Sequence, residues 1–220
     1  MVYSYPMPRI HSIQAGFPRT LSDAGRGMWT TGLFKKPVPG PVRVSRSNIE
    51  GDGQADLRHH GGMDKAVNVY PWEHYALWNR ELAPLALSPG GFGENFTTEG
   101  LSEAEVCIGD SFQAGEAVVQ VSQPRQPCSK LSRRYGIEEF ALRVQRSGRT
   151  GWYLRVLKEG TVEAGSDLRL LKRPFPEWTV AEANEVMHVR KADREASRSL
   201  ASCPLLSESW RATLSKRCQM

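Results

Sequence analysis

Cysteine is scarce in this chain of 220 residues, and long apolar runs are missing. The four cysteines, Cys107, Cys128, Cys203 and Cys218, include no Cys-x-x-Cys pair and no zinc-type spacing, and they are too few for a disulfide scaffold. No stretch approaches the ~18 apolar residues of a membrane-spanning helix, and the first residues hold no apolar run long enough for a signal peptide. These absences argue against secreted disulfide-rich and membrane-spanning proteins, and they predict a protein of the reducing cytoplasm.

The signatures of several large enzyme classes are missing too. The sequence contains no Gly-x-Ser-x-Gly, P-loop, His-Glu-x-x-His or paired-carboxylate motif, and no Gly-x-Gly-x-x-Gly after a strand. Classical hydrolases, NTPases and Rossmann dehydrogenases are therefore disfavoured. The net charge of +5 is spread along the chain, which favours an anionic ligand or a solvated surface over a nucleic-acid-binding tail. The sequence also lacks the interleaved aromatic and basic residues of a single-strand binder.

One segment that does suggest chemistry runs from Val121 to Cys128. Pro124 and Pro127 restrict its backbone, and Arg125 lies three residues before the thiol. Because a nearby cation favours the thiolate form of a cysteine, the segment predicts an active thiolate at Cys128. The alternative is a buried structural cysteine after a strand.

A second polar segment carries adjacent histidines and glycines. His59 and His60 precede Gly61 and Gly62, and Lys65 follows three residues later. Glycine lets the backbone approach a ligand closely, so this segment predicts a loop whose N–H groups, His60 and Lys65 surround an anion. The alternative is a surface turn. It is a poor zinc site, because adjacent histidines usually point apart.

A third segment is Gly93-Glu94-Asn95. An asparagine there can offer a ligand both a hydrogen-bond donor and an acceptor, although the same residues also form ordinary turns. A cysteine nucleophile would need a histidine base, and His60 could serve Cys128 in that way.

The remaining pattern predicts a mainly β fold with some α, built as a β-barrel or a strongly bent sheet. Strands are expected over residues 9–14, 42–46, 67–70, 104–108, 117–121, 152–157 and 167–171, the last two paired as a hairpin. Helices are expected over 72–82 and 137–144, and a long loop over 51–66.

The pattern changes after Pro174, so we expect a barrel domain over residues 1–174 and a helical domain over 175–220. Thr179 and Glu182 have the spacing of a capping box, and further helices are expected near 192–202 and 207–217. About 45 residues make a domain too small to be very stable alone. It should therefore dock on the barrel or on another subunit, the latter making a homodimer.

Taken together, the segments resemble the MOSC family, the domain like the C-terminal part of molybdenum cofactor sulfurases. They occur in family order, as IEGDGQADLRHHGGMDKAV, YPWEHY, GFGENFTTEGL, IGD, QPRQPC and TGWY, within roughly Ile10 to Leu171. The C-terminal helices resemble the three-helix extension of the stand-alone bacterial branch. The resemblance implies a MOSC-type β-barrel core that binds a pyranopterin molybdenum cofactor. It also implies a family-level association with pyridoxal phosphate binding.

The resemblance further implies roles for individual residues. Cys128 would ligate the molybdenum, for which a soft thiolate is suited. His60 would support the ligands of the metal from a second shell, or it would donate a proton. The cofactor's pterin and anionic groups would be bound by Gly61, Gly62, Lys65, Asn95 and Arg125. Cys107, Cys203 and Cys218 are expected to be structural or incidental.

The implied activity is two-electron reduction of N-hydroxylated compounds, such as hydroxylaminopurines, hydroxylamines and amidoximes. An external electron-transfer protein would supply the electrons, because the chain carries no flavin, haem or iron–sulfur motif. Two other functions stay open. One is a sulfur-carrying domain that relays a persulfide on Cys128 without molybdenum, and the other is a non-enzymatic module that binds anions or nucleic acid through its arginines.

Overall fold

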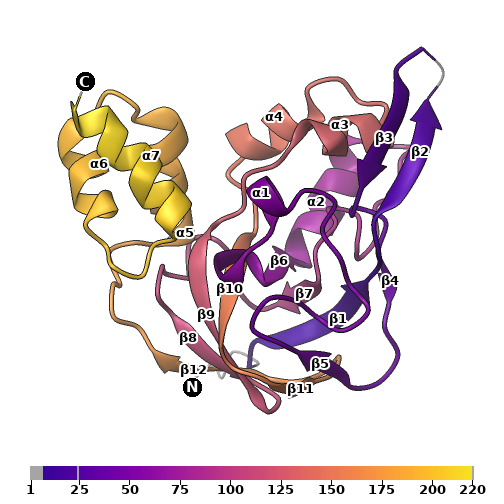
Figure 1. Ribbon diagram of the computed structural model, residues 1–220, viewed down its shortest axis with the longest axis horizontal. Helices are drawn as coiled ribbons and strands as arrows, with labels where there is room; N and C mark the ends of the chain where they lie inside the picture. The colour runs from indigo at the N-terminus through magenta and orange to yellow at the C-terminus, as the bar shows by residue number, and fades with distance from the viewer. Residues whose placement is uncertain (1–6, 24, 220) are drawn as a thin grey trace.

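An eight-stranded sheet forms the centre of the molecule and curls into a half-barrel (Figure 1). The structure is a computed structural model that describes residues 7–23 and 25–219, apart from the side chains of Arg58 and His59. Across the sheet the strands are β12 (Leu168–Lys172), β8 (Ser111–Ala114), β9 (Ala117–Pro124), β10 (Trp152–Lys158), β6 (Val67–Pro71), β7 (Phe96–Glu99), β1 (Arg9–Ala15) and β4 (Lys36–Pro37). This architecture confirms the predicted mainly β fold with added helices.

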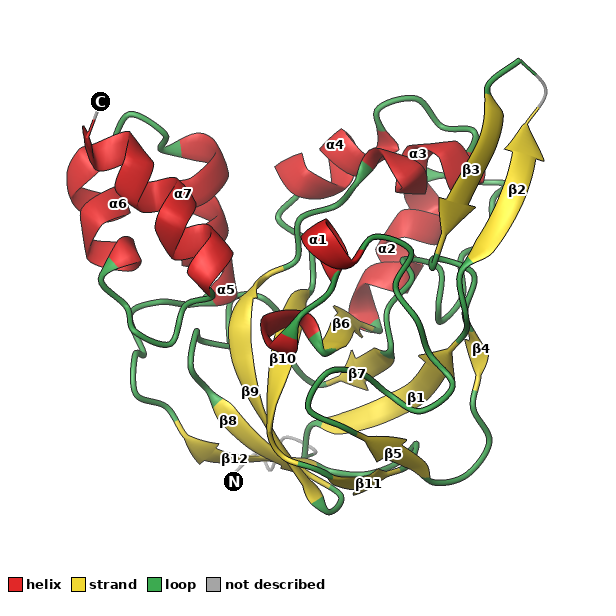
Figure 2. Ribbon diagram, viewed as in Figure 1, coloured by secondary structure: helices red, strands yellow, loops and turns green. Residues whose placement is uncertain are grey.

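The sheet is antiparallel except where β6 runs parallel to β7. Register shifts interrupt the pairing of β9 with β10 and of β8 with β12, and such bulges increase the local twist that curls a sheet. Two smaller pairs lie outside it, β5 (Val42–Val44) with β11 (Gly160–Val162) and β2 (Arg19–Asp23) with β3 (Gly27–Thr31). The β2–β3 hairpin projects as an arm beside α3 (Figure 2).

Four helices and a 3-10 turn decorate the half-barrel, namely α1 (Leu57–His60), η1 (Met63–Lys65), α2 (Glu73–Glu81), α3 (Ser129–Tyr135) and α4 (Phe140–Arg146). An aromatic cluster joins α2 and α4 to the sheet. In it, Tyr70 stacks on Phe92 and accepts a 2.7 Å hydrogen bond from Trp78. This second core packs the helices that flank the candidate site.

The C-terminal helices pack on the barrel of the same chain. They are α5 (Val180–Asn184), which continues into the π-helical turn η2 (Glu185–Val189), α6 (Arg194–Ala201) and α7 (Glu208–Gln219). Thr179 caps α5, as its hydroxyl accepts from Glu182 N at 3.0 Å. The apolar face of α7, with Trp210 and Leu214, is buried in the same core as the barrel strands. The boundary expected after residue 174 lies in the connection between β12 and α5.

Several predicted elements are wrong. The strands expected over 152–157 and 167–171 form no hairpin, because β10 pairs with β6 and β9 while β12 pairs with β8. Residues 104–108 form turns and one isolated bridge at Cys107. The loop expected over 51–66 contains α1 and η1, and the sequence did not reveal β7, β8 or α3. Among the described residues, no helix is long and apolar enough to cross a membrane.

Candidate functional site

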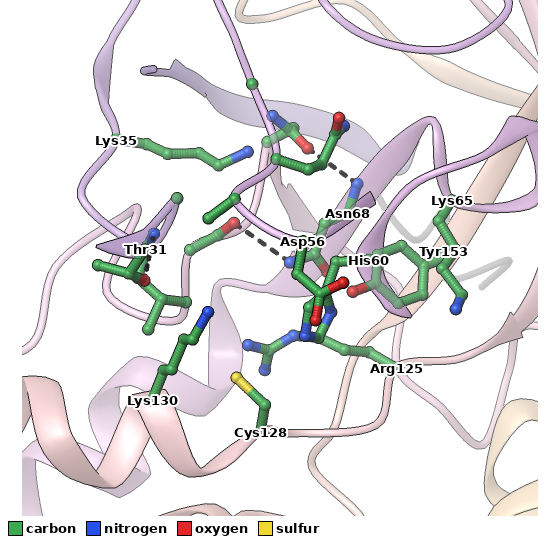
Figure 3. A pocket seen from close by; sticks show the side chains of 17 residues that line it. Thr31, Lys35, Asp56, His60, Lys65, Asn68, Arg125, Cys128, Lys130 and Tyr153 are labelled. Atoms are coloured by element: carbon green, nitrogen blue, oxygen red, sulfur yellow. Dashed lines mark hydrogen bonds between the residues drawn. The ribbon is translucent and has the colours of Figure 1, made fainter. Parts of the chain in front are cut away.

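A pocket brings together the three segments that the sequence singled out (Figure 3). Its walls come from residues within 31–35, 53–68, 93–95 and 125–130, together with Tyr153. It encloses about 580 Å³ of empty space, its open mouth included. Segments far apart in the sequence therefore meet because the sheet curls, and four basic side chains, Lys35, Lys65, Arg125 and Lys130, line the pocket.

Cys128 lies where the loop after β9 meets the start of α3. Its side chain is partly exposed, and in Figure 3 the sulfur points toward Arg125 and Lys130. Helix α3 is held in place by Arg133, whose guanidinium bonds Asp23 at 2.5 Å and Gly27 O at 2.6 Å in the β2–β3 hairpin. The hairpin thus fixes the helix that follows the thiol.

The other cysteines lie away from this pocket. Cys107 and Cys203 are buried, and burial raises the pKa of both thiols. Cys218 lies in α7, where its thiol contacts backbone carbonyls. Only Cys128, of the four, lines the pocket.

Arg125 is 4% exposed, and in Figure 3 its guanidinium lies in the pocket just above the Cys128 sulfur. Its Nη2 donates to Phe92 O at 2.7 Å, and its backbone N donates to Gly151 O at 3.0 Å. Burial raises the pKa of the neighbouring Tyr153, an effect that the adjacent guanidinium opposes. Among the described residues Nη1 has no hydrogen-bond partner, so a buried cationic donor is available to a ligand.

His60 also lines the pocket, at the end of α1. Burial, and then the positive charges of Arg125 and Lys65, lower its pKa to about 4. The imidazole is therefore neutral at pH 7. The side chain of its neighbour His59 lies outside the described residues.

The two glycines that follow serve the turn between α1 and η1. A Cβ at Gly61 would lie 2.8 Å from Leu57 O, and Gly62 has φ 93°, a conformation that favours glycine. Neither residue lines the pocket, although Lys65, at the end of η1, does. Burial lowers the pKa of Lys65, while the carboxylate of Asp64 opposes that change.

The Gly93-Glu94-Asn95 segment reaches the pocket through Gly93 and Asn95. Glu94 is fully buried and holds the segment in shape, accepting from Gly90 N at 2.7 Å, from Thr97 Oγ1 at 2.8 Å and from the Tyr75 hydroxyl. It is a structural residue of the loop.

The amide of Asn95 is already engaged within the protein. Its Nδ2 donates to Asp52 Oδ2 at 2.9 Å and to Gln14 O at 3.2 Å, and its Oδ1 accepts from Asn68 N at 3.0 Å. Its predicted contact with a cofactor would therefore have to share Oδ1. In the structure Asn95 also links the pocket wall to neighbouring segments of the chain.

The sequence alone did not reveal several pocket residues. Lys35 forms a 2.7 Å ion pair with Asp52, and both side chains are almost completely buried, at 6% and 0% exposed. Burial lowers the pKa of Lys35, and Asp52 opposes that shift. Asn68 lies between two valines on β6, a polar residue in an apolar strand, which is the one signal that could have indicated it. Lys130 lies two residues beyond the thiol.

A wide groove continues from this pocket toward the C-terminal helices. It shares Cys128, His60 and Lys65 with the pocket, and its far wall includes His188 and Trp210. Its empty space, with the adjoining solvent, is about 1680 Å³. The C-terminal domain therefore forms one side of the approach to the thiol.

Comparisons with known proteins match both parts of the chain. The family described as MOSC domain matches residues 56–169, and the YiiM-like, 3-alpha helix domain matches residues 178–219. Uncharacterized protein YflK from Bacillus subtilis (strain 168) is 48% identical over 206 residues, covering 94% of this chain and 92% of that protein. The crystal structure of YiiM from Geobacillus stearothermophilus superposes with a TM-score of 0.82 at 38% identity, covering 96% of this chain and 99% of that one.

A third relative carries a functional name. A protein from Gibberella moniliformis (strain M3125 / FGSC 7600) named Reductase is 37% identical over 183 residues. These cover 82% of this chain but 32% of that longer protein.

Proposed function

Because the chain belongs to the MOSC domain family and ends in a YiiM-like three-helix domain, we propose that it binds a molybdenum cofactor and reduces N-hydroxylated compounds. The observation that carries this proposal is the partly exposed Cys128 thiol, which shares a pocket with Arg125, Lys65 and Lys130. The relative named Reductase supports an oxidoreductase of this kind.

The residues of the pocket fit such a cofactor. A thiolate is a soft ligand suited to molybdenum, and cationic side chains suit the phosphate of a pyranopterin. Two buried polar atoms of the pocket, Arg125 Nη1 and Asn68 Oδ1, have no hydrogen-bond partner among the described residues. Buried polar groups are normally paired, so a bound polar ligand explains both atoms.

Each residue then has a defined task. Cys128 would bind the metal, and Arg125, Lys65 and Lys130 would hold the anionic groups. When bound, the cofactor supplies the two-electron chemistry that converts N–OH to N–H with release of water. His60 is neutral at pH 7, so of the two roles that the resemblance implied, support of the metal shell or proton donation, we assign it the first, as a hydrogen bond that orients a ligand.

The open groove provides room for the other participants. A small N-hydroxylated substrate would enter between Cys128 and the wall of the three-helix domain, where His188 and Trp210 lie. Electrons would come from an external electron-transfer protein, because the sequence carries no flavin, haem or iron–sulfur motif.

The test is a metal measurement paired with an activity assay. Protein from a host that makes the cofactor should carry near-stoichiometric molybdenum and reduce an N-hydroxylaminopurine with a strong artificial electron donor. Cys128→Ala should lose both properties. Cys218→Ala, which changes the other partly exposed cysteine, should keep both.

Two outcomes would contradict the proposal. Molybdenum-loaded protein without turnover under the artificial donor would rule out the reductase. Protein without molybdenum but with releasable sulfur on Cys128 would instead support the sulfur-carrier function.

A further inference from the structure

We infer that Asn68 and Arg125 together bind the lactam edge of a heterocyclic ligand, a ring N–H beside a carbonyl oxygen. The inference rests on the proposed function, because a pyranopterin carries such an edge. It adds a ligand-binding residue, Asn68, that the motifs did not indicate.

Asn68 is held in a single orientation by the protein. Its side chain is on β6, it is 8% exposed, and its Nδ2 donates to Gly93 O at 3.2 Å. Because a carbonyl can only accept, this bond fixes which end of the amide is nitrogen. Asn68 lines the pocket, and its remaining end, Oδ1, has no hydrogen-bond partner among the described residues. The protein thus presents a buried acceptor to the pocket.

Arg125 supplies the complementary donor nearby. Its Nη2 bonds Phe92 O at 2.7 Å, while Asn68 bonds Gly93 O. These two carbonyls belong to consecutive residues, whose Cα atoms lie ~3.8 Å apart. The two side chains whose Nη1 and Oδ1 have no hydrogen-bond partner among the described residues are therefore both anchored on the Phe92-Gly93 backbone.

Together the two side chains supply one donor and one acceptor to the same pocket. A ligand satisfies both atoms when it offers an acceptor oxygen to Arg125 Nη1 and an N–H to Asn68 Oδ1. A ring lactam does so with two adjacent atoms. The neighbouring Asn95 is less suited to this role, because both ends of its side-chain amide already bond within the protein.

The experiment titrates the full-length chain, purified without cofactor, with pterin and with 3-methylpterin, following pterin fluorescence. Methylation removes the ring N–H, so wild type should bind pterin about tenfold or more tightly, as expected when a buried acceptor is left unpaired. Asn68→Leu should lose that preference, and Asn68→Asp, which keeps an oxygen in place, should retain much of it.

Gln54→Leu is the matched control. Gln54 lines the same pocket, but its Nε2 already donates to Asn48 Oδ1 at 3.1 Å, so the preference for pterin should persist. The thermal midpoint of each variant shows that it folds. A second readout is the pterin content of protein made in a cofactor-producing host, which should fall about tenfold in Asn68→Leu.

The inference would be overturned if wild type bound both pterins equally, or if it bound neither at about 1 mM, the concentration expected to saturate only weak ligands. An unchanged preference for pterin in Asn68→Leu would overturn it as well. The proposed function fails separately. Preferential pterin binding without N-hydroxyl reduction by loaded protein would leave the inference standing, whereas active loaded enzyme without the preference would remove only the inference.

Discussion

Beneath the pocket, the buried pair of Lys35 and Asp52 connects three parts of the chain. Asp52 accepts from Lys35 Nζ at 2.7 Å, from Asn95 Nδ2 at 2.9 Å and from Gly16 N at 3.0 Å. A buried carboxylate with this many donors is well satisfied, whereas either charge left alone would be costly. The pair therefore holds the pocket floor in one arrangement.

Asp52→Ala should destabilise the protein by about 3 kcal/mol or more, because it leaves the Lys35 ammonium buried without its partner. Urea unfolding measures this loss. Glu159→Gln, which breaks the exposed contact with Arg43 at 2.9 Å, should change the midpoint little. Equal effects of the two substitutions would show that the buried pair has no special structural role.

His188 predicts a pH effect on stability. Burial, and then the charges of Lys191 and Arg217, lower its pKa to about 4 from the ordinary 6.5, and its ring meets Trp210 edge-on. Its folded pKa is below its unfolded pKa, so the fold favours the neutral ring. The corresponding stability is fully present above about pH 6.5 and is lost as the pH falls toward 4.

The measurement is the thermal midpoint of wild type and of His188→Phe from about pH 7.5 to about pH 4.5, a range that covers most of this titration. Wild type should lose about 2 °C more than the variant over this range, a small figure because the ring is partly exposed. His60 titrates in the same range in both proteins, so the difference isolates His188. Parallel curves would contradict the prediction.

Among the elements, η1 and α7 are joined through Asp64. Its carboxylate accepts from Glu208 N, at the start of α7, at 3.2 Å and pairs with Arg155 at 2.8 Å. A negative charge there stabilises the helix N-terminus. Because Lys65 follows Asp64 directly, the same contact fixes the backbone that carries a pocket cation.

Asp64→Ala should cost about 1–2 kcal/mol of stability and also weaken anion binding in the pocket, measured by titration with a phosphorylated pterin. Asp193→Ala is the matched control. Asp193 caps α6 by accepting from Ala196 N at 2.9 Å, so its loss should lower stability without changing pocket affinity. If both variants bind the ligand like wild type, α7 does not position the pocket loop.

The elements that the sequence predicted are those with strong local signals. The period of α2 and the Thr179 cap are such signals, and both elements form. Strand pairing depends on partners distant in the chain, so the expected hairpin of residues 152–157 with 167–171 was wrong. Glycine and charge suggested a loop over 51–66, but tertiary packing gives it two short helical turns.

The same limit applies to the site. Cys128, His60, Lys65 and Arg125 occur in recognisable motifs, and the fold brings all four to one pocket. The role that we infer for Asn68 could not be predicted from the sequence. Whether both ends of a side-chain amide on a strand find hydrogen-bond partners depends on which backbone groups the fold brings near it. Only the folded structure shows that its oxygen has no hydrogen-bond partner among the described residues.

On the scale of the whole molecule, the barrel and the three helices share one core. Buried residues of the sheet, such as Val121 and Leu154, belong to the same apolar cluster as Leu200 and Leu214 of the helices. Backbone bonds cross the junction as well, from Ser207 N to Ser122 O at 2.8 Å. The two family domains therefore share one hydrophobic core and are not connected only by a linker.

A shared interior predicts one cooperative unfolding transition for both domains. Leu214→Ala, at a fully buried site of α7, should cost about 2–5 kcal/mol and lower the midpoint reported by barrel probes as much as that reported by helix probes. Hydrogen exchange can follow amides of β10 and α7 separately while urea is raised. The exposed Leu170→Ala in β12 is the control and should change both midpoints little. If the amides of the helices exchange first while those of β10 stay protected, the three-helix domain folds as an independent unit on the surface of the barrel. Its wall of the groove can then open without disturbing Cys128.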